Sequence, residues 1–347
     1  MNRRYFKRSL LTAMGLATLA PLQSLAAKRP RFDRKRSPRL LKPKALKPGD
    51  TVGLVAPGSA ATEEQFQKSL SQLQSLGLQV RYTDNILARR GYLAGEDQQR
   101  LDDLHQFFAD SSIQGIWCMR GGYGSARLLD RIDYKLIRKN PKVLIGYSDI
   151  TALLQAIHIK TGLVGFHGPV AVSDFNEYTV QQLNALLMSP QRPYRLPYPE
   201  DQGREEVYTI RSGKARGRLI GGNLSLLTAL VGTPYQWKVK GKILFIEDVG
   251  EKPYRIDRML TQLLQSAPLE KAAGIALGVF ANCEAKPGDS SLRLSETLQD
   301  RLAQLGIPVV YGLPFGHISQ QCTLPLGIEA ELDADTGQLT LLETAVK

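Results

Sequence analysis

The sequence is poor in the residues that form disulfide frameworks and metal centres. Its 347 residues include only three cysteines and four histidines. Cys118, Cys283 and Cys322 do not have metal-ligand spacing, and no His-Glu-x-x-His pattern occurs, which disfavours a zinc enzyme. We therefore expect no metal and no other cofactor. Cys118 lies in an apolar run and is expected to be a buried thiol, while a Cys283–Cys322 bridge stays an open alternative.

Patterns that would identify two other enzyme classes are also missing. The sequence contains no Ser-x-x-Lys, which the penicillin-binding type of peptidase requires. No Gly-Lys-Ser/Thr follows a glycine-rich turn, and the glycines do not have the dinucleotide-binding spacing. These absences argue against a nucleotide-binding site.

A surplus of acidic residues is lacking as well, since the formal net charge is +12. Residues 1–40 hold eleven of the 45 Lys and Arg residues and one of the 33 acids, so the other 307 residues carry only +2. A nearly balanced body does not have the electrostatic footprint of a nucleic-acid-binding protein. The composition, 43% hydrophobic and 22% charged, is typical of a globular protein of about two domains.

The N-terminal apolar run is too short to span a bilayer comfortably. Leu10–Ala20 follows a basic stretch and precedes small residues at positions 24, 26 and 27. This three-part pattern predicts an export signal over residues 1–26, with an uncleaved anchor as the alternative. The run RRYFK at residues 3–7 resembles a twin-arginine signal, which exports folded proteins. We therefore expect a periplasmic protein with no stable membrane span after cleavage of the signal.

Residues 27–44 are expected to form a basic, disordered linker. The stretch KRPRFDRKRSPRL (28–40) is basic, contains proline and has almost no apolar residues. A solvated tether is one interpretation, and loose attraction to anionic lipid or wall polymer is another.

Strand and helix patterns alternate over residues 45–170. Short apolar runs begin at residues 52, 78, 113 and 143, and each is followed by a turn and a stretch with helical spacing. This alternation is typical of βαβ units and predicts a doubly wound α/β domain with a parallel sheet.

A Pro-rich, polar stretch interrupts the alternation, and residues 171–212 are expected to form a linker or crossing segment. Residues 213–347 then show helix and strand patterns and end in a hairpin that turns at residues 335–337. We expect them to form a second, smaller, mixed α/β domain.

The stretch IGYSDITALL (145–154) marks the junction of a strand and a helix. In open α/β sheets, ligands bind at the carboxyl ends of the strands, where helix N-termini favour negative charge. Ser148 is therefore a candidate nucleophile, although Ile150 replaces the second glycine of a Gly-x-Ser-x-Gly elbow. The alternative is that Ser148 or Asp149 only caps the helix.

A second strand ends in MRGGYGSAR (119–127). Gly121, Gly122 and Gly124 leave backbone amides uncovered, which suits an oxyanion or a carboxylate, and a plain tight turn is the alternative.

A serine nucleophile needs a base, and four histidines are available. His105 and His158 fall within amphipathic helices and are expected to be structural, while His167 could flank a site. His317 lies in a Gly-flanked loop after a strand, where a base can be presented.

The base in turn needs an acid that orients its ring and stabilises its charged form. Glu247 comes immediately after an apolar strand, where an unpartnered carboxylate would be costly. The adjacent Asp248 is the alternative acid.

At these residues the sequence resembles the LD-carboxypeptidase family, the muramoyl-tetrapeptide carboxypeptidases. The matching stretches cover roughly residues 45–330, in order: GYLAGEDQQRLDDL, MRGGYGSARLLD, IGYSDITALL, GFHGP, GGNLSLL, FIEDVGEKPYRIDRML and GLPFGH. The resemblance implies a triad of Ser148, Glu247 and His317. It also implies oxyanion donors near Gly122 and Asp149, an active site in the cleft between the two domains, and commonly a homodimer.

The reaction implied by the resemblance is hydrolysis of the bond between the L-centre of a diamino acid, usually meso-diaminopimelate, and a terminal D-alanine in a peptidoglycan tetrapeptide. The free carboxylate of that D-alanine needs a cationic or amide-rich clamp, and Arg120 is the candidate. Many family members are cytoplasmic recycling enzymes, so the export signal is a departure that suggests action on periplasmic wall peptides. Two rivals stay open: a peptidase like the microcin C self-resistance enzymes, which cleave acyl-aspartyl nucleotides, and an inactive muropeptide-binding protein.

Overall fold

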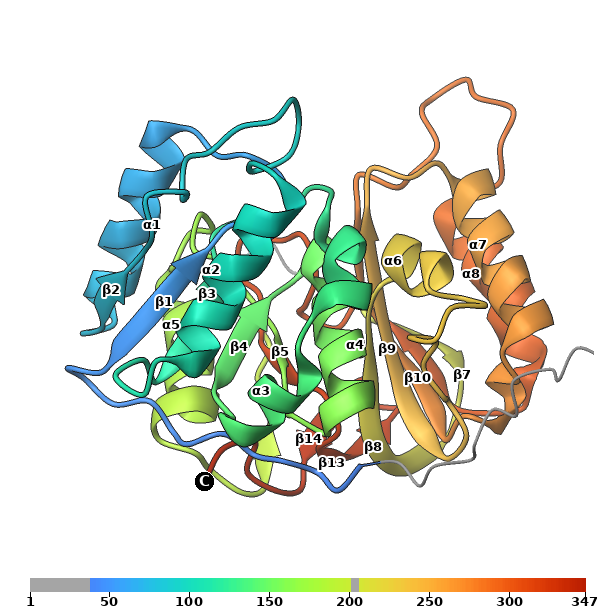
Figure 1. Ribbon diagram of the computed structural model, residues 1–347. Helices are drawn as coiled ribbons and strands as arrows, with labels where there is room; N and C mark the ends of the chain where they lie inside the picture. Colours follow the sequence, from blue (N-terminus) through green and yellow to red (C-terminus); the bar gives the residue numbers. More distant parts are fainter. Residues whose placement is uncertain (1–37, 201–205) are drawn as a thin grey trace, which may run out of the picture. The chain divides into compact units, whose positions relative to one another are not determined.

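The computed structural model describes residues 38–200 and 206–347. The predicted export signal and most of the basic stretch after it lie outside these residues. Within the described ranges, every helix is too short or too polar to cross a bilayer. The described chain is built on two β-sheets with helices packed against them (Figure 1).

The first sheet has six strands in the order β12-β5-β4-β3-β1-β2. All neighbours pair in parallel except the edge strand β12, which is antiparallel to β5. Its central strands are apolar and fully buried, as expected of a parallel sheet covered on both faces. The strands are β1 (Thr51–Val55), β2 (Gln79–Arg81), β3 (Gly115–Cys118), β4 (Val143–Gly146), β5 (Phe166–His167) and β12 (Leu324–Pro325).

Helices cover both faces of this sheet, with α2 and α4 in front of it and α5 behind it in Figure 1. The first helix begins directly after Thr62, which forms a reciprocal capping box with Gln65. The helices are α1 (Glu63–Ser75), α2 (Asp97–Ala109), α3 (Tyr134–Lys139), α4 (Thr151–Thr161) and α5 (Glu177–Leu183), with short 3-10 turns η1 (Ser125–Arg131) and η2 (Ser148–Ile150) and a π-turn η3 (Asn184–Met188).

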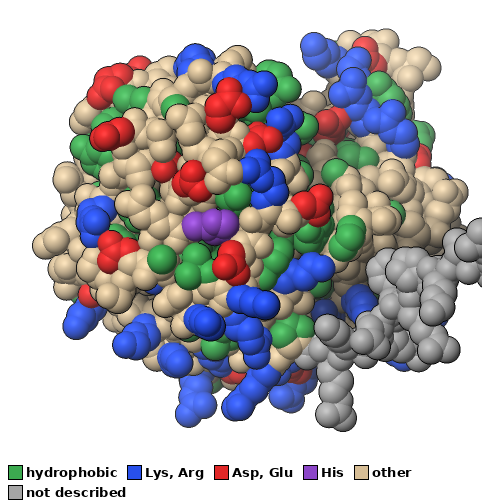
Figure 2. Space-filling model, in the orientation of Figure 1, with side chains coloured by type: hydrophobic (Ala, Val, Ile, Leu, Met, Phe, Trp, Pro, Cys, Tyr) green, Lys and Arg blue, Asp and Glu red, His purple; other side chains and the backbone are tan. Residues whose placement is uncertain are grey.

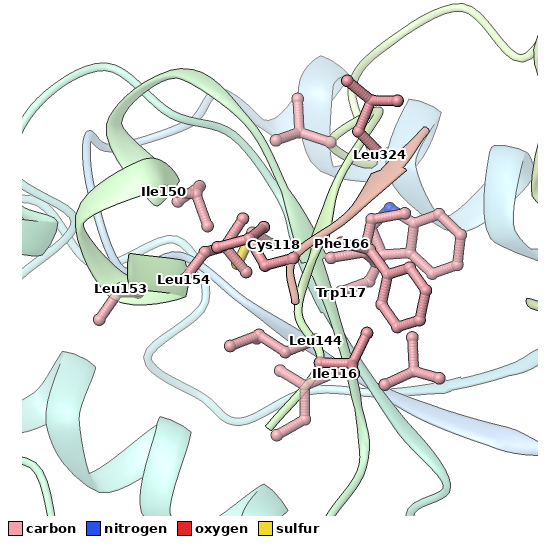
Figure 3. Packing of buried hydrophobic residues seen from close by; sticks show 14 of the residues in the cluster. Ile116, Trp117, Cys118, Leu144, Ile150, Leu153, Leu154, Phe166 and Leu324 are labelled. Carbon is pink, nitrogen blue, oxygen red and sulfur yellow. The ribbon is translucent and has the colours of Figure 1, made fainter. Parts of the chain in front are cut away.

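A continuous apolar core fixes the start of α4 against the strand ends. Side chains from β3, β4, β5, β12 and the first turns of α4 pack together in Figure 3, where the labelled residues are Ile116, Trp117, Cys118, Leu144, Ile150, Leu153, Leu154, Phe166 and Leu324. Full burial of a large apolar side chain contributes about 1.5–3 kcal/mol. This packing holds the turn between β4 and α4, which carries Ser148, in one place.

The second sheet has eight strands in the order β6-β14-β13-β8-β9-β10-β11-β7. Its four inner strands β8 to β11 are parallel, and the flanking strands are antiparallel. The predicted hairpin is confirmed as β13 and β14. The strands are β6 (Tyr194–Arg195), β7 (Tyr208–Arg211), β8 (Lys214–Asn223), β9 (Lys242–Val249), β10 (Gly274–Ala281), β11 (Val309–Tyr311), β13 (Glu329–Asp333) and β14 (Gln338–Leu341).

Three helices accompany the second sheet: α6 (Leu224–Ala229), α7 (Pro253–Ser266) and α8 (Leu294–Leu302), with 3-10 turns η4 (Leu269–Lys271) and η5 (Ala303–Leu305). They share a second apolar core with β8 to β11. The helix α4 contacts β5 of the first sheet as well as β8 and α6 of the second, so it lies between the two sheets (Figure 1). The carboxyl ends of β4 and β9 are thereby brought to the same region.

Several elements differ from the sequence prediction. Segment 171–212, expected as a linker, contains α5, the π-turn and two edge strands. The long strand β8 was missed because three glycines and three exposed charged residues interrupt its apolar pattern. Leu324–Pro325, expected in the C-terminal domain, forms the edge strand of the first sheet.

The basic linker was expected to be disordered to residue 44, and this prediction is wrong for its last part. Leu41 forms a parallel bridge with Leu163, and Pro43 O accepts a hydrogen bond from Lys347 N–H. These apolar and backbone contacts come from residues distant in the sequence, so the local basic composition could not indicate them.

The three cysteines are buried and unpaired, which is the thiol state expected for Cys118 and leaves no Cys283–Cys322 bridge. Burial raises the pKa of all three thiols.

Figure 2 shows Lys and Arg side chains gathered along the lower edge of the face in view, while acids are spread over its upper part.

Candidate active site

A sharp turn presents Ser148 at the carboxyl end of β4. Its φ is 61°, and the only other non-glycine residue with positive φ in the described ranges is Asn282. L-residues avoid this region, and such strain is concentrated at functional sites. The 3-10 turn η2 begins at Ser148 and continues directly into α4. The half-buried serine therefore occupies a strand–helix elbow without the second glycine of the usual pattern.

The helix-capping alternative is not what the structure shows. The residues at the N-cap positions of η2 and α4 are Tyr147 and Ile150, and neither makes a side-chain capping bond. The Asp149 carboxylate instead accepts the Ser125 N–H at 2.9 Å. Burial raises the pKa of Asp149, and the hydrogen bonds from Ser125 oppose that shift. Asp149 thus supports the neighbouring glycine-rich loop, and the Ser148 hydroxyl is not used as a cap.

The glycine-rich loop after β3 lies directly against Ser148. A Cβ added at Gly121 would be 3.2 Å from Ser148 Oγ and 3.3 Å from the amide nitrogen of Asp149. Gly122 has a φ of 92°, and a Cβ there would collide with the Ser59 side chain. Ser59 Oγ also accepts the Tyr123 N–H at 3.0 Å, which braces the loop. Glycine at position 121 therefore allows the loop backbone to approach the hydroxyl this closely.

The Arg120 side chain contacts the segment around the start of α1. Its guanidinium donates to Ala60 O at 3.0 Å and to Gln65 Oε1 at 3.4 Å, at the start of α1. These two contacts use only part of the five N–H donors of an arginine.

Glu247 and His317 form a direct pair. His317 Nδ1 lies 2.7 Å from Glu247 Oε2, and the side chains are 18% and 0% exposed. Glu247 is near the end of β9. The backbone of Gly316, the residue before His317, lies close to Glu247, since a Cβ at Gly316 would be 3.1 Å from Glu247 Cβ. This close approach positions the imidazole beside the carboxylate. Gly316 has a φ of 119°, which only glycine adopts easily. The sequence did not identify this requirement.

Asp248, the alternative acid, is occupied elsewhere. Its carboxylate accepts hydrogen bonds from Asn223 Nδ2 at 3.0 Å, from Ser225 Oγ at 2.8 Å and from two backbone N–H groups. Burial is the main cause that raises the pKa of Asp248, and these hydrogen bonds oppose it. Asp248 therefore ties the end of β9 to the start of α6, whereas Glu247 faces the imidazole.

The two halves of the site meet at Tyr147. The ring of Tyr147, the residue before Ser148, lies 4.6 Å from the ring of His317. In addition, Asn223 N–H donates to Thr151 Oγ1 at 3.0 Å, which joins the end of β8 to the start of α4. Tyr147, the residue before Ser148, thus lies against the imidazole carried by the second sheet.

His167 lies closer to this pair than the sequence indicated. It belongs to β5, is fully buried, and places Nε2 3.9 Å from Glu247 Oε1. The sequence placed His167 beside a site without giving it a role. In residues 38–200 and 206–347, no group of three or more His, Cys, Asp or Glu side chains is arranged to hold a metal ion.

Comparison with known proteins gives one consistent family. Residues 52–168 match the LD-carboxypeptidase N-terminal domain, and residues 216–332 match the LD-carboxypeptidase C-terminal domain. A probable murein peptide carboxypeptidase of Bacillus subtilis is 43% identical over 84% of this chain and 91% of its own length. A murein tetrapeptide carboxypeptidase of Pseudomonas aeruginosa is 36% identical over 82% of this chain and 93% of its own.

Solved structures show the same architecture. A muramoyltetrapeptide carboxypeptidase from Oxalobacter formigenes has a TM-score of 0.74 at 30% identity, covering 85% of this chain and 99% of that one. The microcin C7 self-immunity protein MccF, in complex with aspartyl sulfamoyl adenosine, has a TM-score of 0.82 at 29% identity, covering 88% and 100%. The two-domain α/β fold predicted from the sequence is confirmed.

Proposed function

The chain belongs to the LD-carboxypeptidase family, and from this membership we propose that it is a serine peptidase acting on murein tetrapeptides. The bond cleaved is the one between the L-centre of a diamino acid, meso-diaminopimelate, and the terminal D-alanine. The observation that supports this most directly is the buried Glu247–His317 pair, whose imidazole lies against the residue before Ser148.

In the proposed mechanism, His317 takes the proton of Ser148 while Ser148 Oγ attacks the scissile carbonyl carbon. Glu247, bonded to Nδ1, keeps the other imidazole nitrogen available as the base and stabilises the imidazolium that forms. The imidazolium then gives its proton to the departing amine of D-alanine. Water, activated by the same imidazole, attacks the acyl-enzyme and releases the tripeptide and Ser148.

The negative charge on the carbonyl oxygen needs donors in a fixed position. We propose that the backbone amides near Gly122 and Asp149 supply them. The close approach of the Gly121 backbone to both Ser148 Oγ and the Asp149 amide supports this assignment.

The proposal is tested by incubating the purified protein with a disaccharide tetrapeptide and identifying the products by mass spectrometry. The expected result is loss of one D-alanine from each tetrapeptide. Retention of an intact tetrapeptide, with or without measurable binding, contradicts it, and binding alone would favour the inactive binding protein. Hydrolysis of an acyl-aspartyl nucleotide instead would favour a MccF-like activity, which the TM-score of 0.82 with that protein makes the second candidate.

Arg120 is proposed to bind the free carboxylate of the terminal D-alanine through its remaining donors. We expect Arg120→Ala to raise KM by about 10-fold or more with little change in kcat, because a binding interaction to a charged group is lost. Steady-state kinetics of tetrapeptide hydrolysis measure both constants. Arg127→Ala is the matched control, because Arg127 lies in η1, directly after the same loop, and pairs with Asp97. An unchanged KM in Arg120→Ala would remove Arg120 from substrate binding.

We also propose that the protein acts in the periplasm after twin-arginine export, and as a homodimer. The basic start, the apolar stretch and the small residues of the first 27 positions support export. We expect Arg3→Lys with Arg4→Lys to leave the protein in the cytoplasmic fraction, as measured by fractionation and immunoblotting. Export of this double variant at the wild-type level would exclude the twin-arginine route.

A further inference from the structure

The triad carboxylate uses only one of its two oxygens. Glu247 is fully buried, and its Oε2 accepts from His317 at 2.7 Å. Glu247 Oε1 is also buried and has no hydrogen-bond partner among the described residues. A buried carboxylate oxygen without a donor is destabilising, and native proteins rarely leave one unpaired.

The nearest polar atom facing that oxygen is itself unpaired. His167 is 1% exposed, and neither of its ring nitrogens has a hydrogen-bond partner in the described chain. His167 Nε2 lies 3.9 Å from Glu247 Oε1, which is about 1 Å longer than a hydrogen bond. Catalytic hydrogen bonds are often long in the free enzyme and shorten when substrate is bound.

The charge state of His167 suits a donor rather than an ion pair. Burial, together with the nearby His317, lowers the pKa of His167 to about 3, so its ring is neutral at neutral pH. A neutral imidazole has one N–H. The surrounding rings of Tyr147, Phe245 and Phe315 have centroids 5.4–6.5 Å away and pack around the imidazole at steep angles. Because the His167 ring is neutral, it forms no ion pair that would compete with His317 for the Glu247 carboxylate.

We propose that His167 is a positioning residue of this site, which donates its Nε2–H to Glu247 Oε1 and fixes the carboxylate from the side opposite His317. The inference rests on the proposed function. His167 comes from β5 of the first sheet and Glu247 from β9 of the second, so the bond also joins the two sheets at the reacting groups. With one partner, the carboxylate can rotate away from His317; with two, its plane is fixed.

Two amide variants separate the two ring nitrogens. In His167→Gln the side-chain amide can reach the position of Nε2, whereas in His167→Asn it reaches only that of Nδ1. We expect His167→Gln to keep most of the wild-type kcat, and His167→Asn and His167→Phe to lose about 10–100-fold. KM should stay close to wild type in all three, because His167 is buried away from substrate.

The measurements are kcat and KM on the tetrapeptide, the rate at which a fluorophosphonate labels Ser148, and Tm. The labelling rate reports activation of the serine even if the tetrapeptide is not the substrate, so failure of the proposed function is distinguishable from failure of this inference. His167→Phe retains an aromatic ring for its apolar neighbours and is expected to fold even if His167→Asn does not.

His158 supplies a matched control on α4, because it is half-buried and makes its hydrogen bond through the other nitrogen, Nδ1, to Leu163 O at 2.9 Å. There His158→Asn should preserve Tm, His158→Gln should lower it, and both should keep wild-type kcat.

Equal kcat and labelling rates for the Gln, Asn and Phe variants of His167 would overturn the proposal. Changes that follow Tm rather than the position of the amide would also overturn it, because they would show a structural role only. A wild-type protein that neither hydrolyses tetrapeptide nor is labelled would overturn the triad and this inference together.

Discussion

Ser148→Ala should reduce kcat for D-alanine release by about 10⁴–10⁶-fold, the loss seen when a serine nucleophile is removed from a triad. The reason is that Ser148 carries the aliphatic hydroxyl of the elbow between β4 and α4, against which the glycine-rich loop packs closely at Gly121. KM should change little, since the substrate contacts remain. Mass spectrometry of the wild type stopped during turnover should show an acyl adduct on the peptide that carries Ser148, and the variant should show none.

Ser266→Ala is the control for serine substitution, because Ser266 is exposed at the end of α7 and donates to Gln262 O. Ser148→Gly adds a second readout. Glycine accepts a φ of 61°, whereas an L-residue is destabilised there by about 1–2 kcal/mol. Ser148→Gly should therefore be as inactive as Ser148→Ala, and its free energy of unfolding in urea should be higher than that of Ser148→Ala. Substantial D-alanine release by either variant would contradict a serine mechanism.

Glu247→Gln should reduce kcat by about 10³–10⁴-fold with little loss of folded protein. The amide can donate to Nδ1 of His317, which stabilises the tautomer whose other nitrogen already carries a proton and cannot accept one from Ser148. Steady-state kinetics and a thermal melt measure the two effects.

Asp248→Asn is the counterpart that separates the neighbouring acids. The Asp248 carboxylate accepts hydrogen bonds from the backbone and from Asn223 and Ser225. An amide NH₂ would face one of these donors, and we expect a destabilisation of about 1–3 kcal/mol with kcat near wild type. A large loss of kcat in Asp248→Asn together with an active Glu247→Gln would reverse the assignment of the orienting acid.

The sequence predicted best the elements whose signal is local. The helix α1 follows from a Thr62 cap and regular apolar spacing, and β4 and β9 follow from compact apolar runs. The position of Ser148 at a strand–helix junction was likewise readable from the pattern around it. Its backbone conformation was not, because a positive φ at a serine leaves no mark in composition or spacing.

What the sequence could not show depends on contacts between distant residues. The two-residue strand β12 exists because Leu324–Pro325 pairs with Phe166–His167, and the equally short β5 pairs with both β12 and β4. The choice between Glu247 and Asp248 depends on the hydrogen-bond partners of each carboxylate. The partner of Glu247 is His317, which lies 70 residues further along the chain. The resemblance to the family pointed to Glu247, and the residues alone left both acids open.

The pairing of β12 with β5 limits how this protein can be divided. Without Leu324–Pro325, a fragment ending near residue 170 would present the unpaired backbone of β5 at the margin of its sheet, beside apolar Phe166. Exposed strand margins of this kind recruit other chains. The matched N-terminal family domain, produced alone, is thus prone to aggregate, whereas its co-production with the remaining fragment offers a route to reassembly by complementation.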